Sequence, residues 1–283
     1  MKFTKMNGLG NDYLYIYCDE VPENVAELAI KYSDRHFGVG SDGLIYILPS
    51  DVADFKMRIF NADGSEAMMC GNGIRCVGKY VHDLGYTSKT TVTVETLSGI
   101  KTLKLTVEDN STKLVSVEMG RAIVGEDMTP KIACGKFFDE VTGEFGDSRN
   151  GREPVPCTPV DMGNPHAVIF VRDAEKAPVS IVGPAIEKNA DFPGGVNVEF
   201  IQKLSDTEIR MRVWERGSGI TWACGTGSCA SVAAAISKGM CPRNTDVTVH
   251  LDGGDLIINI DDDNNVLMTG PATFVCDGTT IDD

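Results

Sequence analysis

The sequence predicts an α/β fold of the α+β type, built from two pseudo-symmetric halves that each wrap a barrel-like β-sheet around a central helix. Three observations support this prediction. One segment of the chain is repeated at a fixed distance, short β-rich runs dominate both halves, and the two clearest helix signals each begin at a repeated cysteine.

The repeated segment contains a strand-like run followed by a cysteine and glycines. The first copy consists of Met57–Asn61 and Cys70–Gly73, and the second of Met211–Glu215 and Cys224–Gly227. Each part of the first copy lies 154 positions before the matching part of the second (211 − 57 and 224 − 70). One cysteine per copy suggests two equivalent thiols that face each other across a pseudo-twofold axis. Such a pair suits a reaction that removes a proton from one face of a carbon and delivers one to the other.

The repeat also sets the expected domains. Gly10-Asn11 and Gly163-Asn164 each precede a strand-like run, and Met119–Ala122 resembles Met268–Ala272 near the end of the other half. We therefore expect an N-terminal half over residues 1–119 and a C-terminal half over residues 120–270.

Strand signals are short runs rich in β-branched and aromatic residues between Gly, Asn, Pro or Asp. Two pairs of them bracket glycine turns, at Ser98-Gly99 and at Asp252–Gly254, as hairpins do. The predicted strands are Tyr13–Tyr17, Leu44–Leu48, Val92–Thr96, Thr102–Val107, Val168–Val171, Val247–Leu251 and Leu256–Ile260. The polar, glycine-rich stretch over residues 139–153 predicts an exposed loop.

Two helices are predicted after the repeated cysteines. Following Cys70, apolar residues recur at helical spacing until Gly85. Following Cys224, Ala230–Ile236 is small or apolar on every side, and Gly239 ends the run. A helix without a polar face is buried, which places a helix inside each sheet.

The composition of the chain argues against some classes of binding partner. The 283-residue chain carries 26 basic and 41 acidic residues, a net charge of −15, which argues against nucleic acid and anionic membranes as partners. No apolar run approaches the roughly 20 residues of a membrane span, and Met1–Lys5 continues directly into strand-like sequence. We expect a cytoplasmic protein. Its nine cysteines are expected to be mostly reduced thiols.

The two repeated cysteines have a setting that favours ionisation. Free N–H groups and the positive end of the dipole at a helix N-terminus lower the pKa of a thiol. The glycines that follow allow backbone N–H groups to approach an anion closely. Each copy therefore supplies a thiol and half of a carboxylate-binding cradle.

Three other interpretations are open at this point. The thiols could be structural, with glycines that only permit tight packing. Cys70, Cys76, Cys224 and Cys229 could bind a metal, although zinc sites usually have shorter cysteine spacings. Gly225–Ala230 fits the G-x-G-x-x-A pattern of dinucleotide sites, but Asp246 precedes its strand instead of following one. Repetition at a fixed offset favours paired catalytic thiols over all three.

The motifs together resemble the diaminopimelate epimerase family. The resemblance runs in order from the N-terminus to about Gly270, and it is carried by Asn7–Asp12, Asn61–Ser65, Cys70–Cys76, Met162–His166, Trp214–Gly219 and Ala223–Gly227. It implies a cofactor-independent epimerase that interconverts LL- and meso-2,6-diaminopimelate on the route to lysine and peptidoglycan. It also implies that the active site lies in the cleft between the halves and that residues 271–283 return to the first half. A homodimer is compatible with the resemblance.

The resemblance also implies residue roles. Cys70 and Cys224 correspond to the base and the acid, and His166 and Glu215 to residues that tune thiol ionisation. The matching substrate contacts are Asn11, Asn61, Asn164, Asn197 and Arg216, with Gly71, Asn72, Gly225 and Thr226 as the cradle. No metal and no cofactor are expected. Gly43 departs from some relatives, which carry Gln there. Either Ser41, the backbone or water replaces that contact, or the contact is dispensable.

The nearest rival is a proline or hydroxyproline racemase-type enzyme on the same scaffold. Such relatives are expected to carry His after the first Cys-Gly, where this chain has Asn72. Arg216 beside Glu215 also favours a substrate with a second charged end. A rival from another class is a non-catalytic thiol protein, such as a zinc-binding module.

Overall fold

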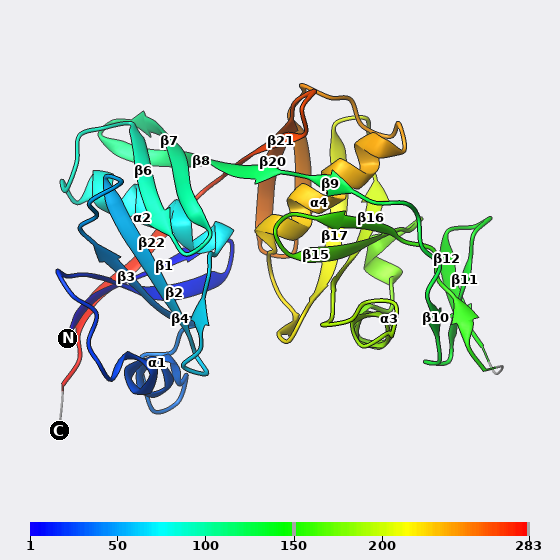
Figure 1. Ribbon diagram of the computed structural model, residues 1–283, viewed down its shortest axis with the longest axis horizontal. Helices are drawn as coiled ribbons and strands as arrows, with labels where there is room; N and C mark the ends of the chain where they lie inside the picture. Colours follow the sequence, from blue (N-terminus) through cyan, green and yellow to red (C-terminus); the bar gives the residue numbers. More distant parts are fainter. Residues whose placement is uncertain (149–150, 282–283) are drawn as a thin grey trace. The chain divides into compact units, whose positions relative to one another are not determined.

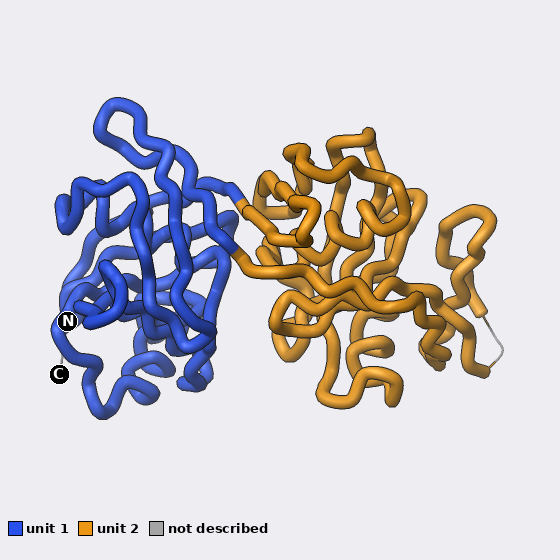
Figure 2. The backbone as a smooth tube through the Cα atoms, turned by 45° about the horizontal axis from the view of Figure 1, so that its top comes forward, with its two compact units in different colours: residues 1–118, 269–283 blue, residues 119–268 orange. Residues whose placement is uncertain are grey.

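The computed structural model describes residues 1–148 and 151–281. The chain forms two compact units (Figure 2), one of Met1–Glu118 with Thr269–Asp283 and one of Met119–Met268. Both chain ends therefore belong to the first unit. The expected return of residues 271–283 includes 282–283, which lie outside the described residues. None of the described helices is long and apolar enough to span a membrane.

Seven strands of the first unit follow one pairing order, with β5 paired to β4, β8 paired to β7, and two helices. The order is β7-β6-β4-β3-β2-β1-β22, in which β2/β3 and β4/β6 are parallel. Its elements are β1 (Lys2–Gly8), β2 (Asn11–Tyr17), α1 (Val25–Ser33), β3 (Gly43–Leu48), β4 (Phe55–Asn61), β5 (Glu66–Ala67), α2 (Gly71–Asp83), β6 (Thr91–Thr96), β7 (Gly99–Glu108), most of β8 (Ser111–Arg121) and β22 (Thr273–Thr279).

The second unit repeats this pairing order as β20-β19-β17-β16-β15-β14-β9, with β15/β16 and β17/β19 parallel. Its elements are β9 (Ile123–Val124), β10 (Lys131–Ile132), β11 (Lys136–Asp139), β12 (Glu144–Asp147), β13 (Glu153–Pro154), β14 (Thr158–Asp161), β15 (Pro165–Phe170), the 3-10 turn η1 (Ala174–Lys176), α3 (Val179–Glu187), β16 (Asn197–Lys203), β17 (Glu208–Glu215), β18 (Gly219–Ile220), α4 (Gly225–Ser237), β19 (Val247–Leu251), β20 (Gly254–Ile260) and β21 (Asn265–Gly270).

The predicted mixed fold of many strands and few helices is confirmed. Both predicted hairpins form, β6 with β7 and β19 with β20. The two predicted helices are α2 and α4, and each begins directly after its repeated cysteine. Figure 1 shows each of these helices among the strands of its own unit. Nearly all of α4 is buried, as its lack of a polar face predicts.

Two further helices, α1 and α3, are absent from the sequence prediction. Each has nine residues and connects two parallel strands, β2 to β3 and β15 to β16. Both are too short to give a clear periodic signal, and α3 contains Pro184, a residue that normally marks a helix end. They also extend the repeat, because Val25 and Val179 are 154 positions apart (179 − 25).

Helices on both faces explain why β3 reads as a continuous apolar run. All six of its residues are buried. Leu44 and Tyr46 pack with Ala29 and Tyr32 of α1, while Ile45 lies on the alternate face, toward Gly73 of α2. In the second unit, Val182 and Ile186 of α3 likewise pack against the β15/β16 face. One sheet layer thus separates a covering helix from the helix that begins at the cysteine.

Strand register identifies equivalent positions in the two units. Leu14 pairs with Leu44 as Ala167 pairs with Val198, and this alignment continues along the strands. In the first unit, Tyr13, Gly43, Ile45 and Asn61 therefore occupy the places that His166, Asn197, Glu199 and Glu215 hold in the second.

The expectation that residues 139–153 form an exposed loop is wrong in part, because the short strands β11 and β12 lie in or at the edge of this stretch. Phe138 pairs with Phe145 in a short hairpin of β11 and β12, and the two rings lie 5.0 Å apart. Phe145 also contacts Phe200 of the core. Alternating polar residues and glycines hid this hairpin, whose two aromatic side chains fix it to the unit. Residues 149–150 of the stretch lie outside the described residues.

Gly43 adopts a conformation that only glycine tolerates here. Its φ is +157°, and a Cβ atom would lie 2.2 Å from the carbonyl oxygen of Phe60 on the paired strand. A side chain at position 43 would therefore force the β3/β4 ladder apart. A glutamine at this position would need a shift of the strand.

We predict that Gly43→Ala lowers the free energy of unfolding by about 2–3 kcal/mol more than Gly99→Ala. Gly99 is the matched control, because it has a φ of +97° but open space around the added Cβ. Urea unfolding of both variants measures the difference. Equal losses would show that β3 relaxes freely at this position.

Candidate active site

Cys70 and Cys224 have the same local geometry. Each is the N-cap of its helix with extended backbone, at φ −134° and −115°. In each, the thiol sulfur accepts a hydrogen bond of 3.3 Å from the amide of the third helical residue, Gly73 or Gly227. Such a contact, together with the helix dipole, stabilises a thiolate.

The glycine at this third position is required in both units for close packing. A Cβ on Gly73 would lie 2.6 Å from Cδ1 of Ile45, and one on Gly227 would lie 2.8 Å from Oε1 of Glu199. The backbone of each helix start therefore rests directly on a strand. What differs is the strand side chain beneath it, which is apolar in the first unit and ionisable in the second.

In the first unit, Asn11 positions the Cys70 thiol. The thiol lies 3.3 Å from Oδ1 of Asn11, and Nδ2 of Asn11 donates to Asp42 at 2.6 Å. Arg35 joins Asp42 to Asp12 with contacts of 2.8 and 2.7 Å. The orientation of Asn11 is thus set by an ionic network behind it.

The other predicted residues of the first unit surround the start of α2 or a neighbouring turn. Arg75, fully buried, donates to the carbonyl of Gly71 and to Oδ1 of Asn72, both at 3.1 Å. Asn61 donates to Ser65 at 3.1 Å and stabilises its own turn. The hydrogen bonds named here thus hold Asn61 and Asn72 against neighbouring residues of the first unit.

Ser41 does not stand in for the missing side chain at Gly43. Its hydroxyl is buried, 3.0 Å from the carbonyl oxygen of Gly43 and 3.2 Å from Oγ of Ser33. Both contacts lie within the first unit, one of them to the last residue of α1. The backbone or water then remains to replace the glutamine contact, or the contact is dispensable.

In the second unit, His166 lies at the centre of a buried polar cluster. Its Nδ1 is 2.7 Å from Oε1 of Glu199, and its Nε2 is 3.1 Å from Oδ1 of Asn164. Asn164 donates through Nδ2 to the hydroxyl of Thr226 at 3.3 Å, and that hydroxyl lies 3.7 Å from the sulfur of Cys224. A continuous chain of side chains therefore links His166 to the thiol.

Glu215 and Cys224 influence each other electrostatically. Burial raises the pKa of Cys224 well above its ordinary value, and the carboxylates of Glu215 and Glu199 raise it further. Burial likewise raises the pKa of Glu215, whose Oε1 accepts a hydrogen bond from the hydroxyl of Thr221. With its pKa raised, Cys224 is a thiol at neutral pH.

Asn197 and Arg216 lie together at the ends of β16 and β17. Asn197 is buried; its Nδ2 donates to the carbonyl of Pro165 at 3.0 Å, and its Oδ1 accepts from the backbone amide of Arg216 at 2.9 Å. The guanidinium of Arg216 donates to the carbonyl of Gly194. Asn197 therefore fixes the backbone from which the Arg216 side chain extends.

Four residues of these clusters were missed in the sequence: Asp42, Arg35, Thr221 and Glu199. Glu199 had a usable signal, since it is a charged residue of β16 between the buried apolar residues Val198 and Phe200. Asp42, Arg35 and Thr221 stand in turns where polar residues are common, so only their contacts identify them.

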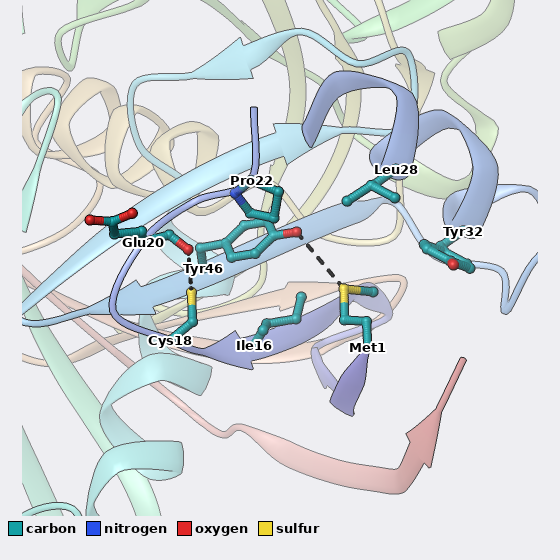
Figure 3. A pocket seen from close by; sticks show the side chains of 8 residues that line it. All are labelled: Met1, Ile16, Cys18, Glu20, Pro22, Leu28, Tyr32 and Tyr46. Atoms are coloured by element: carbon teal, nitrogen blue, oxygen red, sulfur yellow. Dashed lines mark hydrogen bonds between the residues drawn. The ribbon is translucent and has the colours of Figure 1, made fainter. Parts of the chain in front are cut away.

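A separate pocket of about 260 Å³ lies in the first unit and contains none of the predicted site residues. Figure 3 shows the hydroxyl of Tyr46 directed at the sulfur of Met1, 3.8 Å away, and the thiol of Cys18 directed at the carbonyl of Glu20, 3.1 Å away. It is lined by Met1, Ile16, Cys18, Glu20, Pro22, Leu28, Tyr32 and Tyr46. Its mostly apolar lining does not suit a substrate with two charged ends.

The metal interpretation finds no support in side-chain placement. Across residues 1–148 and 151–281, no group of three or more His, Cys, Asp and Glu side chains is arranged to hold a metal ion. Cys76 and Cys229 are fully buried inside their helices, and burial raises the pKa of Cys76 to about 11.

Curated relatives cover almost the whole chain. Diaminopimelate epimerase of Acetivibrio thermocellus is 52% identical over 98% of this chain and 98% of its own length. The enzymes of that name from Bacillus pumilus and Bacillus subtilis are 50% and 46% identical, again over 98% of this chain, and over 98% and 97% of their own lengths.

Solved structures of low sequence identity share the fold. A PhzF-family phenazine biosynthesis protein of Bacillus anthracis matches with a TM-score of 0.74 and 18% identity, over 99% of this chain and 98% of the other. A probable proline racemase of Agrobacterium radiobacter matches with 0.71 and 17%, over 100% and 93%. At such identities the likeness establishes the fold alone.

The sequence profile described as Diaminopimelate epimerase matches residues 3–124 and 158–275. Both matched ranges contain one of the two cysteine-capped helices. With a profile match of this extent and curated relatives near 50% identity, the chain belongs to the diaminopimelate epimerase family.

Proposed function

We propose that this protein is an isomerase that interconverts LL- and meso-2,6-diaminopimelate, a step of lysine biosynthesis, with two thiols and no cofactor. The observation that carries the proposal is the matched pair of helix starts. Each presents a cysteine sulfur 3.3 Å from a backbone amide, in a chain about half identical to enzymes named for this reaction. The substrate is a small biosynthetic amino acid, so we place the reaction in the cytoplasm.

The proposed reaction exchanges one proton for another at the α-carbon. A thiolate takes the α-proton from one face, which forms an S–H bond and leaves the electron pair of the C–H bond on carbon. The second thiol gives its proton to the opposite face and becomes the thiolate. Cys70 and Cys224 thus exchange protonation states in each turnover, and the reverse reaction swaps their roles.

Backbone amides supply the stabilisation that a thiolate alone lacks. An amino-acid α-proton is far too weakly acidic for a free thiolate to remove, so the developing negative charge must be delocalised into the substrate carboxylate and held there. We assign that role to the amides of Gly71, Asn72, Gly225 and Thr226. Their positions in the first turn of α2 and α4 favour an anion.

We assign Cys224 as the thiol of the resting protein. The direction of its pKa supports this assignment, because burial and the nearby carboxylates of Glu215 and Glu199 all disfavour the thiolate there. Cys70 is less buried and has Ile45, not a carboxylate, under its helix start. The Cys70 thiol, which donates to Oδ1 of Asn11, gives up that hydrogen bond when it ionises. In this assignment Cys70 then removes the α-proton first and Cys224 delivers one.

The remaining predicted residues recognise a substrate with two amino-acid ends. We assign Asn11, Asn61 and Asn164 to its polar groups, since an amide both donates to a carboxylate and accepts from an ammonium. Arg216 provides a cation for the distal carboxylate, and Asn197 holds Arg216 in place through its backbone amide. His166 and Glu215 set the ionisation of Cys224.

Incubation with LL-diaminopimelate in deuterated water is predicted to yield meso product with deuterium at one α-carbon, measured by mass spectrometry and NMR. Proline is the control and is predicted not to exchange, because it lacks the second charged end that Arg216 recognises. Exchange of proline without exchange of diaminopimelate would contradict the substrate assignment.

Cys70→Ala and Cys224→Ala are each predicted to lower epimerisation by at least about 10³-fold, since each removes the acid or the base of the reaction. Cys76→Ala and Cys229→Ala are matched controls in the same two helices, and both should keep turnover within a few-fold. Epimerisation is followed by chiral chromatography. Near-normal turnover in either of the first two variants would rule out the two-thiol mechanism.

A further inference from the structure

Five side chains of the second unit form one hydrogen-bonded chain that ends at Cys224. In order they are Glu199, His166, Asn164, Thr226 and Cys224, joined by contacts of 2.7, 3.1, 3.3 and 3.7 Å. The first two are buried, with 0% and 1% of their surface exposed. The chain therefore extends from the interior of the sheet to the reactive sulfur.

The fold itself does not require the two ionisable residues, Glu199 and His166, with which this series of hydrogen bonds begins. The equivalent places in the first unit are occupied by Ile45 and Tyr13, which are also buried. An unpaired buried carboxylate is strongly unfavourable, and Oε2 of Glu199 has no hydrogen-bond partner among the described residues. His166 is therefore the group that balances the charge of Glu199.

The direction of each hydrogen bond follows from what its acceptor can do. A carboxylate only accepts, so Nδ1 of His166 carries a proton toward Glu199. The amide oxygen of Asn164 also only accepts, so Nε2 carries one as well. In this arrangement both ring nitrogens of His166 face acceptor oxygens, a geometry that suits an imidazolium paired with Glu199.

The same donor-to-acceptor direction continues along the hydrogen bonds as far as the sulfur of Cys224. Asn164 turns its oxygen to His166, so its Nδ2 donates to the hydroxyl of Thr226. The oxygen of Thr226 is then an acceptor for Asn164, and its own proton is free to point at Cys224. A thiolate at Cys224 accepts that proton as a hydrogen bond, whereas a thiol does not need it.

We propose that Glu199 is a positioning residue of the epimerase, which keeps a second proton on His166 and so directs the Thr226 hydroxyl at Cys224 whenever that thiol ionises. This rests on the proposed function, because the chain is useful only if Cys224 alternates between thiol and thiolate. The other titratable groups facing it are Glu215, from β17, and Cys224 itself, while β14 places apolar Val160 opposite His166.

A simpler role for Glu199 makes the opposite prediction. If Glu199 acted only as a nearby negative charge, its removal would make the Cys224 thiolate easier to form. If it acts through His166, its removal also takes away the imidazolium and the donor that it orients, and the thiolate becomes harder to form. The sign of the change separates the two roles.

The test compares Glu199→Gln with Glu215→Gln by the pH dependence of iodoacetamide alkylation, measured on the Cys224 peptide by mass spectrometry. We expect Glu199→Gln to slow alkylation of Cys224 at a fixed pH about tenfold, the scale of one hydrogen bond to a charged group, and Glu215→Gln to accelerate it. Glu199→Asp, which keeps the charge, should recover part of the loss. Faster or unchanged alkylation in Glu199→Gln overturns the proposal.

A second measurement is made on the wild-type protein and does not need the Glu199→Gln variant to fold. Only four histidines are present, so ¹⁵N labelling of histidine resolves each ring. We expect one histidine of the wild-type protein, the one lost in His166→Gln, to stay protonated on both nitrogens at pH 8. Asp255→Asn is the matched control, because Asp255 lies 2.8 Å from Nδ1 of exposed His250, and it should leave that signal unchanged. A singly protonated His166 in the wild type overturns the proposal.

Neither readout uses diaminopimelate. If the wild-type protein fails to exchange the α-proton, the proposed function fails, while alkylation and histidine protonation still decide the role of Glu199. If the wild-type protein turns over normally and Glu199→Gln alkylates as fast as the parent, the function stands and this inference falls.

Discussion

The contact between a cysteine sulfur and the amide of the third residue of a helix is the interaction on which the rest of this structure depends. It occurs twice, at 3.3 Å, and it requires the helix to start at the cysteine with glycine at the third position. Glycine is needed because the helix start rests on a strand, leaving no room for a Cβ. The parallel strands and their crossover helices serve to hold that strand in place.

The two units use this scaffold with different electrostatics. Beneath Cys70 the strand presents Ile45, with Tyr13 beside it, whereas beneath Cys224 it presents Glu199 and His166. The duplicated backbone therefore supplies the same reactive group twice, and the side chains behind it differentiate the two thiols. That difference is useful in a reaction whose two thiols must be in opposite protonation states at the start of each turnover.

Much of the fold could be predicted from the sequence because its signals are local. The cysteine, the glycines after it and the apolar run that follows specify the start of α4 within a few residues. The short helix α3, with Pro184 inside it, forms because it covers an apolar sheet face, which no local pattern reveals. Glu199 does carry a local signal, as a charge between apolar residues, but its partner His166 is 33 positions away in the chain, so only the fold reveals the pair.

The isotope pattern at the earliest stage of the reaction tests the two-thiol account most directly. LL-diaminopimelate is converted in deuterated water, and both isomers are isolated after a few per cent of conversion. The account predicts deuterium at the inverted carbon of meso product and none in the recovered LL substrate, because the acid carries a solvent proton and the base returns the one it removed. Product that keeps the original proton, or substrate that exchanges as fast as product forms, would contradict two separate thiols on opposite faces of one carbon.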